Sequence, residues 1–304
     1  MQVEIATDNT KAPSREKLAE YIFADIAQAL NIGSGNLLYR FLNRIGTPAA
    51  LRFAEILRHM DQGVAAKSVH ETAVEALSFF TDGWDFRGTE QIPREGPLLV
   101  VANHPGTADS ISAVGAVGRR DVSMVAGKRP MLEVLPNLRR YLLFLDKDPG
   151  HRMGIMRQII QKLKEGQSVV IFPRGLLEPD PALIPGALES LKNWSDSVGV
   201  FLNKVPETRV QPLLISQTVA PKAWQSLLVA CGDTPKKRQQ IAMIWQFAMQ
   251  RLSRSASWKI PVRVDAGQAI QARDLSGSLD PREISEGIKS SMASLLRATY
   301  PGNL

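Results

Sequence analysis

The sequence has little of the chemistry on which several protein classes depend. Cys231 is the only cysteine among 304 residues, so an intrachain disulfide and a multi-cysteine metal site are both excluded. Of the four histidines, those other than His104 lack metal-like spacing with carboxylates. Glycine-rich phosphate loops of the G-x4-G-K-[ST] type are absent. We therefore expect no bound metal and a reducing, cytoplasmic compartment.

Long apolar runs are also missing. No window approaches the ~18 uninterrupted apolar residues of a membrane-spanning helix. The first residues, MQVEIATDNTKAPSREK, carry charges of both signs and do not resemble a secretory signal. We expect a cytoplasmic protein that can lie peripherally on the inner face of the membrane but does not cross it.

The sequence does carry an excess of positive charge. The formal net charge is +7 and the pI is about 9.6, which favours an anionic partner such as nucleic acid, anionic lipid or a phosphorylated metabolite. Residues 222–259 contain seven basic residues and one acidic residue, so almost the whole excess lies in one segment. No nucleic-acid-binding motif accompanies it, and we expect no nucleic-acid partner.

The chain changes character near residue 82. Residues 14–80 show helical spacing of apolar residues, with Ser14 as a candidate N-cap, and the Gly46-Thr47-Pro48 triplet predicts a break followed by a new helix that Thr47 caps. From residue 83 onward, short apolar runs alternate with helical patterns. We predict an N-terminal helical region over 1–82 and an α/β domain over 83–304 with a largely parallel sheet flanked by helices.

Two of the predicted strands end in polar loops. LLVVA leads into Asn103-His104-Pro105-Gly106-Thr107-Ala108-Asp109, and SVVI leads into Phe172-Pro173-Arg174-Gly175. Ligands gather at the carboxyl ends of parallel strands. The sequence therefore predicts that His104 and Arg174 lie at the same edge of the sheet.

His104 and Asp109 form the candidate catalytic pair. On an unbroken helix, residues five apart point in different directions, but Pro105-Gly106 cannot lie inside a helix. We predict that Thr107 caps a helix beginning near Ala108, so that the chain folds back and Asp109 accepts a hydrogen bond from one ring nitrogen of His104. The other nitrogen is then available to take a proton from a substrate hydroxyl. Alternatively, Asp109 only complements the helix dipole and His104 is a polar loop residue.

The stretch WDFRGTEQIPREGPLLVVANHPGTAD from Trp84 resembles the start of the glycerolipid acyltransferase family, which includes lysophosphatidate and glycerol-3-phosphate acyltransferases. Four later segments are similar to family segments in the same order: LLFLDKD (142–148), VVIFPRG (169–175), VQPLLIS (210–216) and VRVDAG with a terminal helix. Together the resemblance covers 84–218 and 260–300. It implies His104 as the general base and Asp109 as its partner in the N-H-x4-D motif.

The resemblance also implies acceptor-binding residues, with two departures. Lys147 stands where the family usually has an arginine that binds the acceptor's phosphate. Arg174 replaces the glutamate of the F-P-E-G block, and Leu177 replaces the arginine that commonly follows it. Arg174 can bind an anionic group itself, assisted by Lys147 and by Lys128 or Arg129. Alternatively, Arg174 is a surface residue paired with Glu178, and the acceptor has no phosphate.

Two further features concern ligands. Gly175, with Pro173, is expected to let the backbone pass close to a ligand. PKKRQQIAMIWQFAMQRLSR (235–254) predicts a basic amphipathic helix that packs its apolar face either on the core or on anionic lipid. In the second case its Trp245, with Trp224 and Trp258, would lie at headgroup depth. The predicted apolar face is made of Ile241, Ile244, Trp245, Ala248, Met249 and Leu252.

We conclude that the sequence predicts an acyltransferase. It would move a fatty acyl group from acyl-CoA or acyl carrier protein to a hydroxyl of a glycerolipid-like acceptor, such as glycerol-3-phosphate or a lysophospholipid, without a cofactor. One alternative keeps the fold and changes the acceptor to a non-phosphorylated alcohol or an amine. A second alternative is a non-catalytic lipid-binding protein.

Overall fold

The computed structural model describes residues 12–29, 37–146, 148–252 and 258–302. Its centre is an eight-stranded sheet in the order β1-β7-β6-β2-β5-β3-β4, with β8 paired to β6. All pairs are parallel except those of β6 with β7 and with β8. The predicted α/β fold with a largely parallel sheet is therefore confirmed. The strands are β1 Trp84–Arg87, β2 Leu98–Ala102, β3 Val122–Gly127, β4 Leu142–Leu145, β5 Ser168–Ile171, β6 Arg209–Ser216, β7 Val262–Ala266 and β8 Ile270–Gln271.

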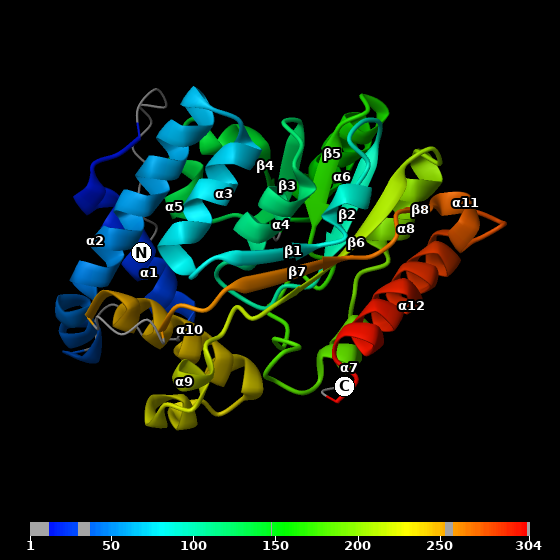
Figure 1. Ribbon diagram of the computed structural model, residues 1–304. Coiled ribbons are helices and arrows are strands. Elements are labelled where there is room, and N and C mark those ends of the chain that lie inside the picture. Colours follow the sequence, from blue (N-terminus) through cyan, green and yellow to red (C-terminus); the bar gives the residue numbers. More distant parts are fainter. Residues whose placement is uncertain (1–11, 30–36, 147, 253–257, 303–304) are drawn as a thin grey trace.

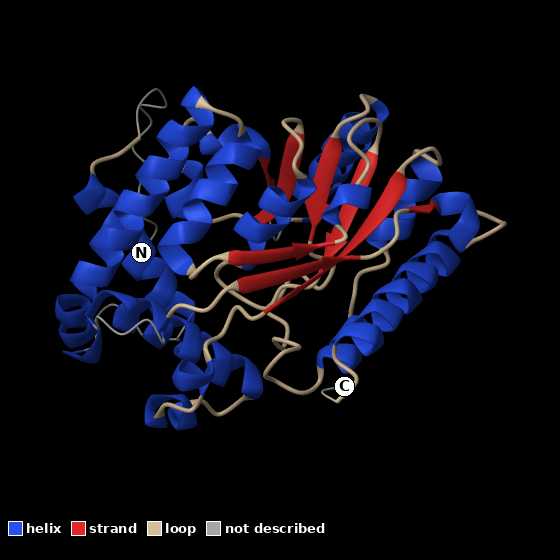
Figure 2. Ribbon diagram, in the orientation of Figure 1, coloured by secondary structure: helices blue, strands red, loops and turns tan. Residues whose placement is uncertain are grey.

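Helices cover both faces of this sheet (Figures 1 and 2). They are α1 Arg15–Ala29, α2 Leu37–Ala66, α3 Val69–Phe80, α4 Asp109–Val117, α5 Pro130–Glu133, α6 Pro149–Lys164, α7 Ala187–Leu191, α8 Ser197–Lys204, α9 Pro221–Trp224, α10 Pro235–Leu252, α11 Ala272–Leu275 and α12 Pro281–Thr299. Three short 3₁₀ helices, η1 Thr89–Gln91, η2 Leu138–Tyr141 and η3 Leu227–Cys231, complete the elements. Over the described ranges, none of the helices combines the length and the apolar character needed to cross a bilayer.

Strand β2 lies near the middle of the sheet because every one of its side chains is apolar. Leu98, Val100 and Ala102 point into a core shared with α1–α4, whereas Leu99 and Val101 point into a core shared with α6, α7, α8 and α12. All five are fully buried, as expected for a parallel strand that is covered on both faces. This burial fixes the register of β2 and so the place where the following loop leaves the sheet.

The N-terminal helical region packs directly on this sheet. Ser14 does act as the N-cap of α1, since its hydroxyl accepts a hydrogen bond from the Lys17 backbone N–H. The predicted break at Pro48 is wrong, because α2 runs through it. The Thr47 hydroxyl donates back to the Asn43 carbonyl instead of capping a new helix. Proline removes a single backbone hydrogen-bond donor from the helix. Burial of the side chains that follow it offsets that loss, because Ala50, Ala54 and Leu57 belong to the main core.

Candidate active site

The loop after β2 is attached to the neighbouring strand by an asparagine. The Asn103 side-chain amide donates to the Ile215 carbonyl at 2.8 Å and accepts from the Ile215 N–H at 2.7 Å. Asn103 is buried, and its amide therefore continues the β2–β6 pairing by one more position after the backbone has turned away. The residue that follows, His104, is consequently held at the carboxyl edge of the sheet.

His104 and Asp109 meet as predicted from their spacing. The Nδ1 of His104 lies 2.7 Å from Oδ2 of Asp109, which is almost fully buried, while 34% of the His104 side chain remains exposed. An ionised carboxylate only accepts hydrogen bonds, so Nδ1 carries the proton and Nε2 is left as a lone-pair acceptor. The Phe172 ring packs 4.9 Å from the imidazole ring, between centroids. This arrangement can extract a proton from a hydroxyl that reaches Nε2.

The predicted cap of the following helix is wrong by one residue. Helix α4 begins at Asp109 and its N-cap is Ala108, without a side-chain capping bond from Thr107. The Asp109 carboxylate supplies the capping instead, because Oδ1 accepts from the Ser110 N–H and Oδ2 accepts from the Gly106 N–H. The same carboxylate therefore orients His104, closes the turn and starts the helix.

Gly106 is required by close packing in this turn. A Cβ atom at this position would lie 2.8 Å from the Thr218 hydroxyl and 3.4 Å from the sulfur of Met243. Thr218 cannot move aside easily, because Asp180 accepts hydrogen bonds from its N–H and its hydroxyl. Asp180 is fully buried and also accepts from the Gln217 and Val219 N–H groups, which fixes the turn after β6.

The surroundings of His104 shift its pKa. Burial of the ring acts to lower the pKa, whereas the charge of Asp109, the hydrogen bond to it and the charge of Glu178 act to raise it. The net result is a pKa above the ordinary 6.5. His104 is therefore a stronger base than a free imidazole, and a larger share of it is protonated at neutral pH.

Glu178 is a site residue whose position the sequence did not reveal. It is buried, its Oε1 accepts from the Ser190 hydroxyl and from Nε1 of Trp194, and its Oε2 accepts from the His104 N–H at 3.0 Å. The Glu178 N–H in turn donates to the His104 carbonyl at 2.8 Å. Burial raises the pKa of Glu178, opposed by these hydrogen bonds. Three donors converge on this carboxyl, and Glu178 forms no ion pair with Arg174, so the alternative in which these two residues pair is wrong.

Helix α10 contributes glutamines to the site, while Ile241, Trp245 and Met249 of its predicted apolar face pack on a small apolar cluster of the protein. Gln239 is buried and donates from Nε2 to the carbonyls of Pro105 and Glu178, so it joins the two loops that surround His104. Gln246 bonds to Ala220 and Thr218. Five residues of the predicted face (Ile241, Ile244, Trp245, Ala248 and Met249) are only partly buried, and the Leu252 side chain lies outside the described residues. Part of the predicted face therefore packs on the protein, as in the first of the two predicted alternatives. Periodicity did not reveal the glutamines, whose amides bond to backbone groups of neighbouring loops.

Arg174 leaves the neighbouring strand β5 and lies half-buried in the loop after it. Its Nε is buried and has no hydrogen-bond partner, and Arg174 forms no ion pair with any described residue. Gly175 has a left-handed backbone with φ of 63°, and its N–H donates to the Phe172 carbonyl to close a turn. No atom lies within 4 Å of a Cβ built at Gly175, so this glycine serves the turn rather than a tight contact within the chain.

The remaining predicted cations differ from Arg174. Lys128 follows β3, and its Nζ lies 3.2 Å from Asp146 and 3.8 Å from Glu133. Arg129 lies 3.8 Å from Asp25. These cations are thus largely compensated by carboxylates. Lys147 lies outside the described residues. Among the described side chains, no group of three or more His, Cys, Asp or Glu residues is arranged to hold a metal ion.

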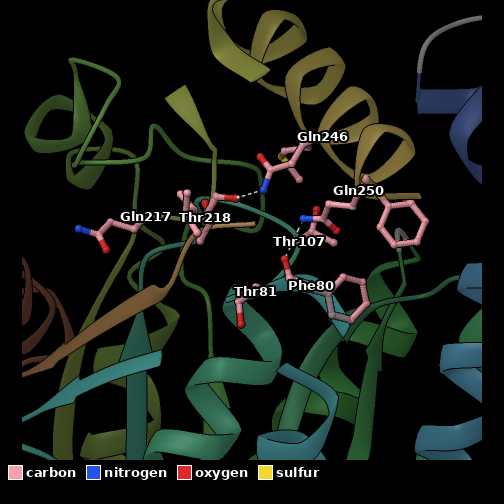
Figure 3. Close-up of a pocket in the computed structure, with 11 residues that line it drawn as sticks. Phe80, Thr81, Thr107, Gln217, Thr218, Gln246 and Gln250 are labelled. Carbon is pink, nitrogen blue, oxygen red and sulfur yellow. Dashed lines mark hydrogen bonds between the residues drawn. The ribbon is translucent and has the colours of Figure 1, made fainter. Parts of the chain in front are cut away.

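A small cavity lies behind the His104 loop. It is about 20 Å³ in volume and is lined by Thr107 and Ala108 on one side and by α10 on the other. Figure 3 shows Gln246 of α10 bonded to Thr218 and Gln250 of α10 bonded to Phe80 across this cavity. Space of this size holds about one water molecule. A larger ligand does not fit there, and the exposed side of the His104 ring is the accessible approach to Nε2 among the described residues.

Part of the chain is similar to a known protein family. Residues 84–197, from β1 to the start of α8, match the model of the acyltransferase family, described as "Acyltransferase". A solved structure with a similar chain is the 1-acyl-sn-glycerophosphate (LPA) acyltransferase PlsC from Thermotoga maritima, at 18% identity and a TM-score of 0.44, covering 94% of this chain and 96% of that one. No curated protein sequence matches the chain.

Proposed function

Because this chain is an acyltransferase that carries the family's domain over residues 84–197, we propose that it acylates a hydroxyl of a glycerolipid-like acceptor from acyl-CoA or acyl carrier protein. The observation that supports this most directly is the pair formed by His104 and Asp109, with Nδ1 bonded at 2.7 Å and the ring edge exposed. A base held in this way serves proton transfer and has no purpose in a protein that only binds lipid. The acyltransferase domain argues against that alternative as well.

The proposed reaction proceeds without an acyl-enzyme. Nε2 of His104 removes the proton of the acceptor hydroxyl as its oxygen attacks the thioester carbonyl carbon. Asp109 stabilises the imidazolium that forms, and backbone N–H groups of the loop stabilise the tetrahedral oxyanion. Collapse of this intermediate breaks the carbon–sulfur bond, and the imidazolium returns its proton to the departing thiolate. The products are an ester and a free thiol, and no cofactor is consumed.

We assign recognition of the acceptor to Arg174. The Arg174 guanidinium, at the edge that carries His104, has a buried Nε without a bond to any described residue, and it suits a phosphate group of the acceptor, such as that of glycerol-3-phosphate or a lysophospholipid. Gly175 shapes the turn that presents it, and Lys128 and Lys147 have supporting roles. A non-phosphorylated alcohol or an amine would make no use of this charge, and the test below distinguishes it from a phosphorylated acceptor.

We further propose that the enzyme is cytoplasmic and works as a peripheral protein on the inner face of the membrane. A lipid acceptor is presented at a bilayer surface, and the basic segment 235–254 carries charge of the sign that attracts anionic lipid.

The decisive experiment is product analysis with labelled donors. Wild-type protein is incubated with labelled acyl-CoA or labelled acyl carrier protein and with extracted lipids, and the product is identified by chromatography. The variant His104→Ala should lose product formation by roughly 10³-fold or more, whereas His59→Ala, at an exposed histidine of α2, should retain it. Absence of product with both donors, or equal turnover by His104→Ala, would contradict the proposal. A product without a phosphate would favour the alternative acceptor.

A further inference from the structure

Helix η3 presents two consecutive leucines to solvent. Leu227 is 90% exposed and Leu228 is 46% exposed. The other large apolar side chains that are exposed in the described part of the chain occur singly, as with Leu145 and Met153. Scattered apolar side chains are ordinary on protein surfaces, but an adjacent pair with one member almost wholly in water marks an interaction site.

The leucines are exposed on an ordered support. Between them and α10, Val229 is buried in a small apolar cluster with Ala223 and Ala242. The Val229 N–H donates to the Ser226 carbonyl and the Gly232 N–H donates to the Val229 carbonyl, so the turn is closed on both sides. This support holds Leu227 and Leu228 outward, and we refer to these two residues with η3 as the leucine tip.

Positive charge surrounds the leucine tip. Lys222 precedes it in α9, and Lys236 and Arg238 follow it at the start of α10, all three exposed. Arg238 is adjacent to the tip, because its Nε donates to the Gly232 carbonyl at 3.0 Å. The acidic residue in this stretch, Asp233, is paired with Lys237 at 3.4 Å. An apolar point within a cationic surface matches a bilayer with anionic headgroups over an apolar interior.

The leucine tip lies on the side of the sheet that holds the active site. Figure 1 shows the segment with α9 and α10 below the sheet, where β2 and β6 end. The direct connection is Gln239, one residue after Arg238, whose amide donates to the carbonyl of Pro105 in the His104 loop. A surface that contacts the cationic first turn of α10 therefore lies close to the opening through which His104 is exposed.

From these observations we propose that the leucine tip inserts into the headgroup region of an anionic bilayer while the cations around it bind lipid phosphates. The proposal rests on the proposed function only in that a membrane-borne acceptor gives this contact a purpose. A bilayer suits the tip better than an acidic carrier protein, since a projecting side chain that is 90% exposed needs a matching hollow in a protein partner, whereas lipid adapts to it.

The test measures binding without turnover. Full-length protein is sedimented with vesicles of equal parts phosphatidylglycerol and phosphatidylcholine. The double variant Leu227→Asp/Leu228→Asp should bind at least about 10-fold more weakly than wild type, and Lys236→Glu should weaken binding to these vesicles but not to phosphatidylcholine alone. Met153→Asp is the matched control, because Met153 is 53% exposed on α6. Unfolding temperatures of all variants establish that the fold is retained.

The outcomes are distinguishable from those of the proposed function. His104→Ala should bind vesicles as wild type does, even though it makes no product. The double variant should still acylate a water-soluble, short-chain acceptor at the wild-type rate. Unchanged vesicle binding by the double variant would overturn the proposal. It would also be overturned if the double variant kept vesicle binding and lost binding to acyl carrier protein, which would identify that protein as the partner.

Discussion

The loops that leave β2 and β5 start side by side at one edge of the sheet, and the first residues of the β5 loop, 172–176, are held very differently from those of the β2 loop. In the β2 loop, Asn103 and the backbone of His104 bond to the buried Ile215 and Glu178, and the His104 ring bonds to Asp109 at the start of α4. In the β5 loop, the Arg174 Nε is buried without a partner, and Leu176 is 50% exposed. The difference suits the two roles that we propose. A group that transfers a proton needs one fixed geometry, whereas a group that binds an acceptor needs room to adjust to it.

The largest effect should come from breaking the fixed loop at Asp109. The variant Asp109→Asn should lower kcat by roughly 10³-fold, because the amide can hold His104 in the wrong tautomer and cannot stabilise the imidazolium. The neutral form of His104 is the active one, so activity of the wild type should rise with pH through its raised pKa. Removing the negative charge lowers that pKa, and the rising limb of the kcat/KM profile should move to lower pH. If the rising limb of the kcat/KM profile stayed at the same pH in Asp109→Asn, Asp109 would not be responsible for the raised pKa of His104.

A smaller effect is expected from Glu178, which acts on His104 through the backbone. In Glu178→Gln an amide replaces a carboxyl group that accepts three hydrogen bonds. The NH₂ group of the amide cannot accept, so at least one of the three donors loses its acceptor. We expect kcat to fall about 10- to 100-fold with little change in KM. The rising limb should also move to lower pH, since Glu178 contributes to the raised pKa of His104.

The matched control for Glu178 is Glu189→Gln, at an exposed residue of α7 that pairs only with Lys192 at the surface. Thermal unfolding of both variants separates a loss of stability from a loss of activity. If Glu178→Gln reduced stability and left the pH profile of the remaining activity unchanged, Glu178 would be a structural residue only.

The smallest effect should come from the open loop. Arg174→Ala should raise KM for a phosphorylated acceptor about 10-fold and leave kcat nearly unchanged, as expected for loss of one charge-assisted contact. Lys128→Ala should have less effect, because Asp146 and Glu133 already compensate its charge. Arg157→Ala, at an exposed arginine of α6, controls for net charge. An equal loss of kcat in Arg174→Ala would mean that this loop also belongs to the fixed part of the site.

The sequence was sufficient to predict the elements that carry the site. Apolar runs such as LLVVA are long and uniform enough to specify a buried strand, and Pro105-Gly106 specified the turn that brings His104 to Asp109. Both conclusions depend on neighbours within a few residues. The family resemblance then indicated what the pair is for.

Partners that are distant in the sequence could not be predicted. The contact of Glu178 with His104 spans 74 residues, and that of Gln239 with Pro105 spans 134. Nothing in the local pattern distinguishes these residues from ordinary polar surface residues. The apolar stripe of α10 was only a partial guide: Ile241, Trp245 and Met249 pack on the protein, but periodicity did not indicate that buried glutamines share this helix. At Pro48, burial of the surrounding helix outweighed a local signal to stop.

The single side-chain amide of Gln239 has a consequence for engineering this protein. It donates hydrogen bonds to two carbonyls from two different loops. It belongs to α10, which follows the segment 219–234 that leaves the sheet after β6. This segment therefore cannot be exchanged between related proteins without regard to the position of α10. If residues 219–238 are replaced, the geometry of the His104 loop is retained only when α10 keeps its orientation about its own axis and its distance from that loop. Shifting the sequence of α10 by one residue would rotate this amide by about 100° about the helix axis, and the carbonyls of Pro105 and Glu178 would lose their hydrogen-bond donor.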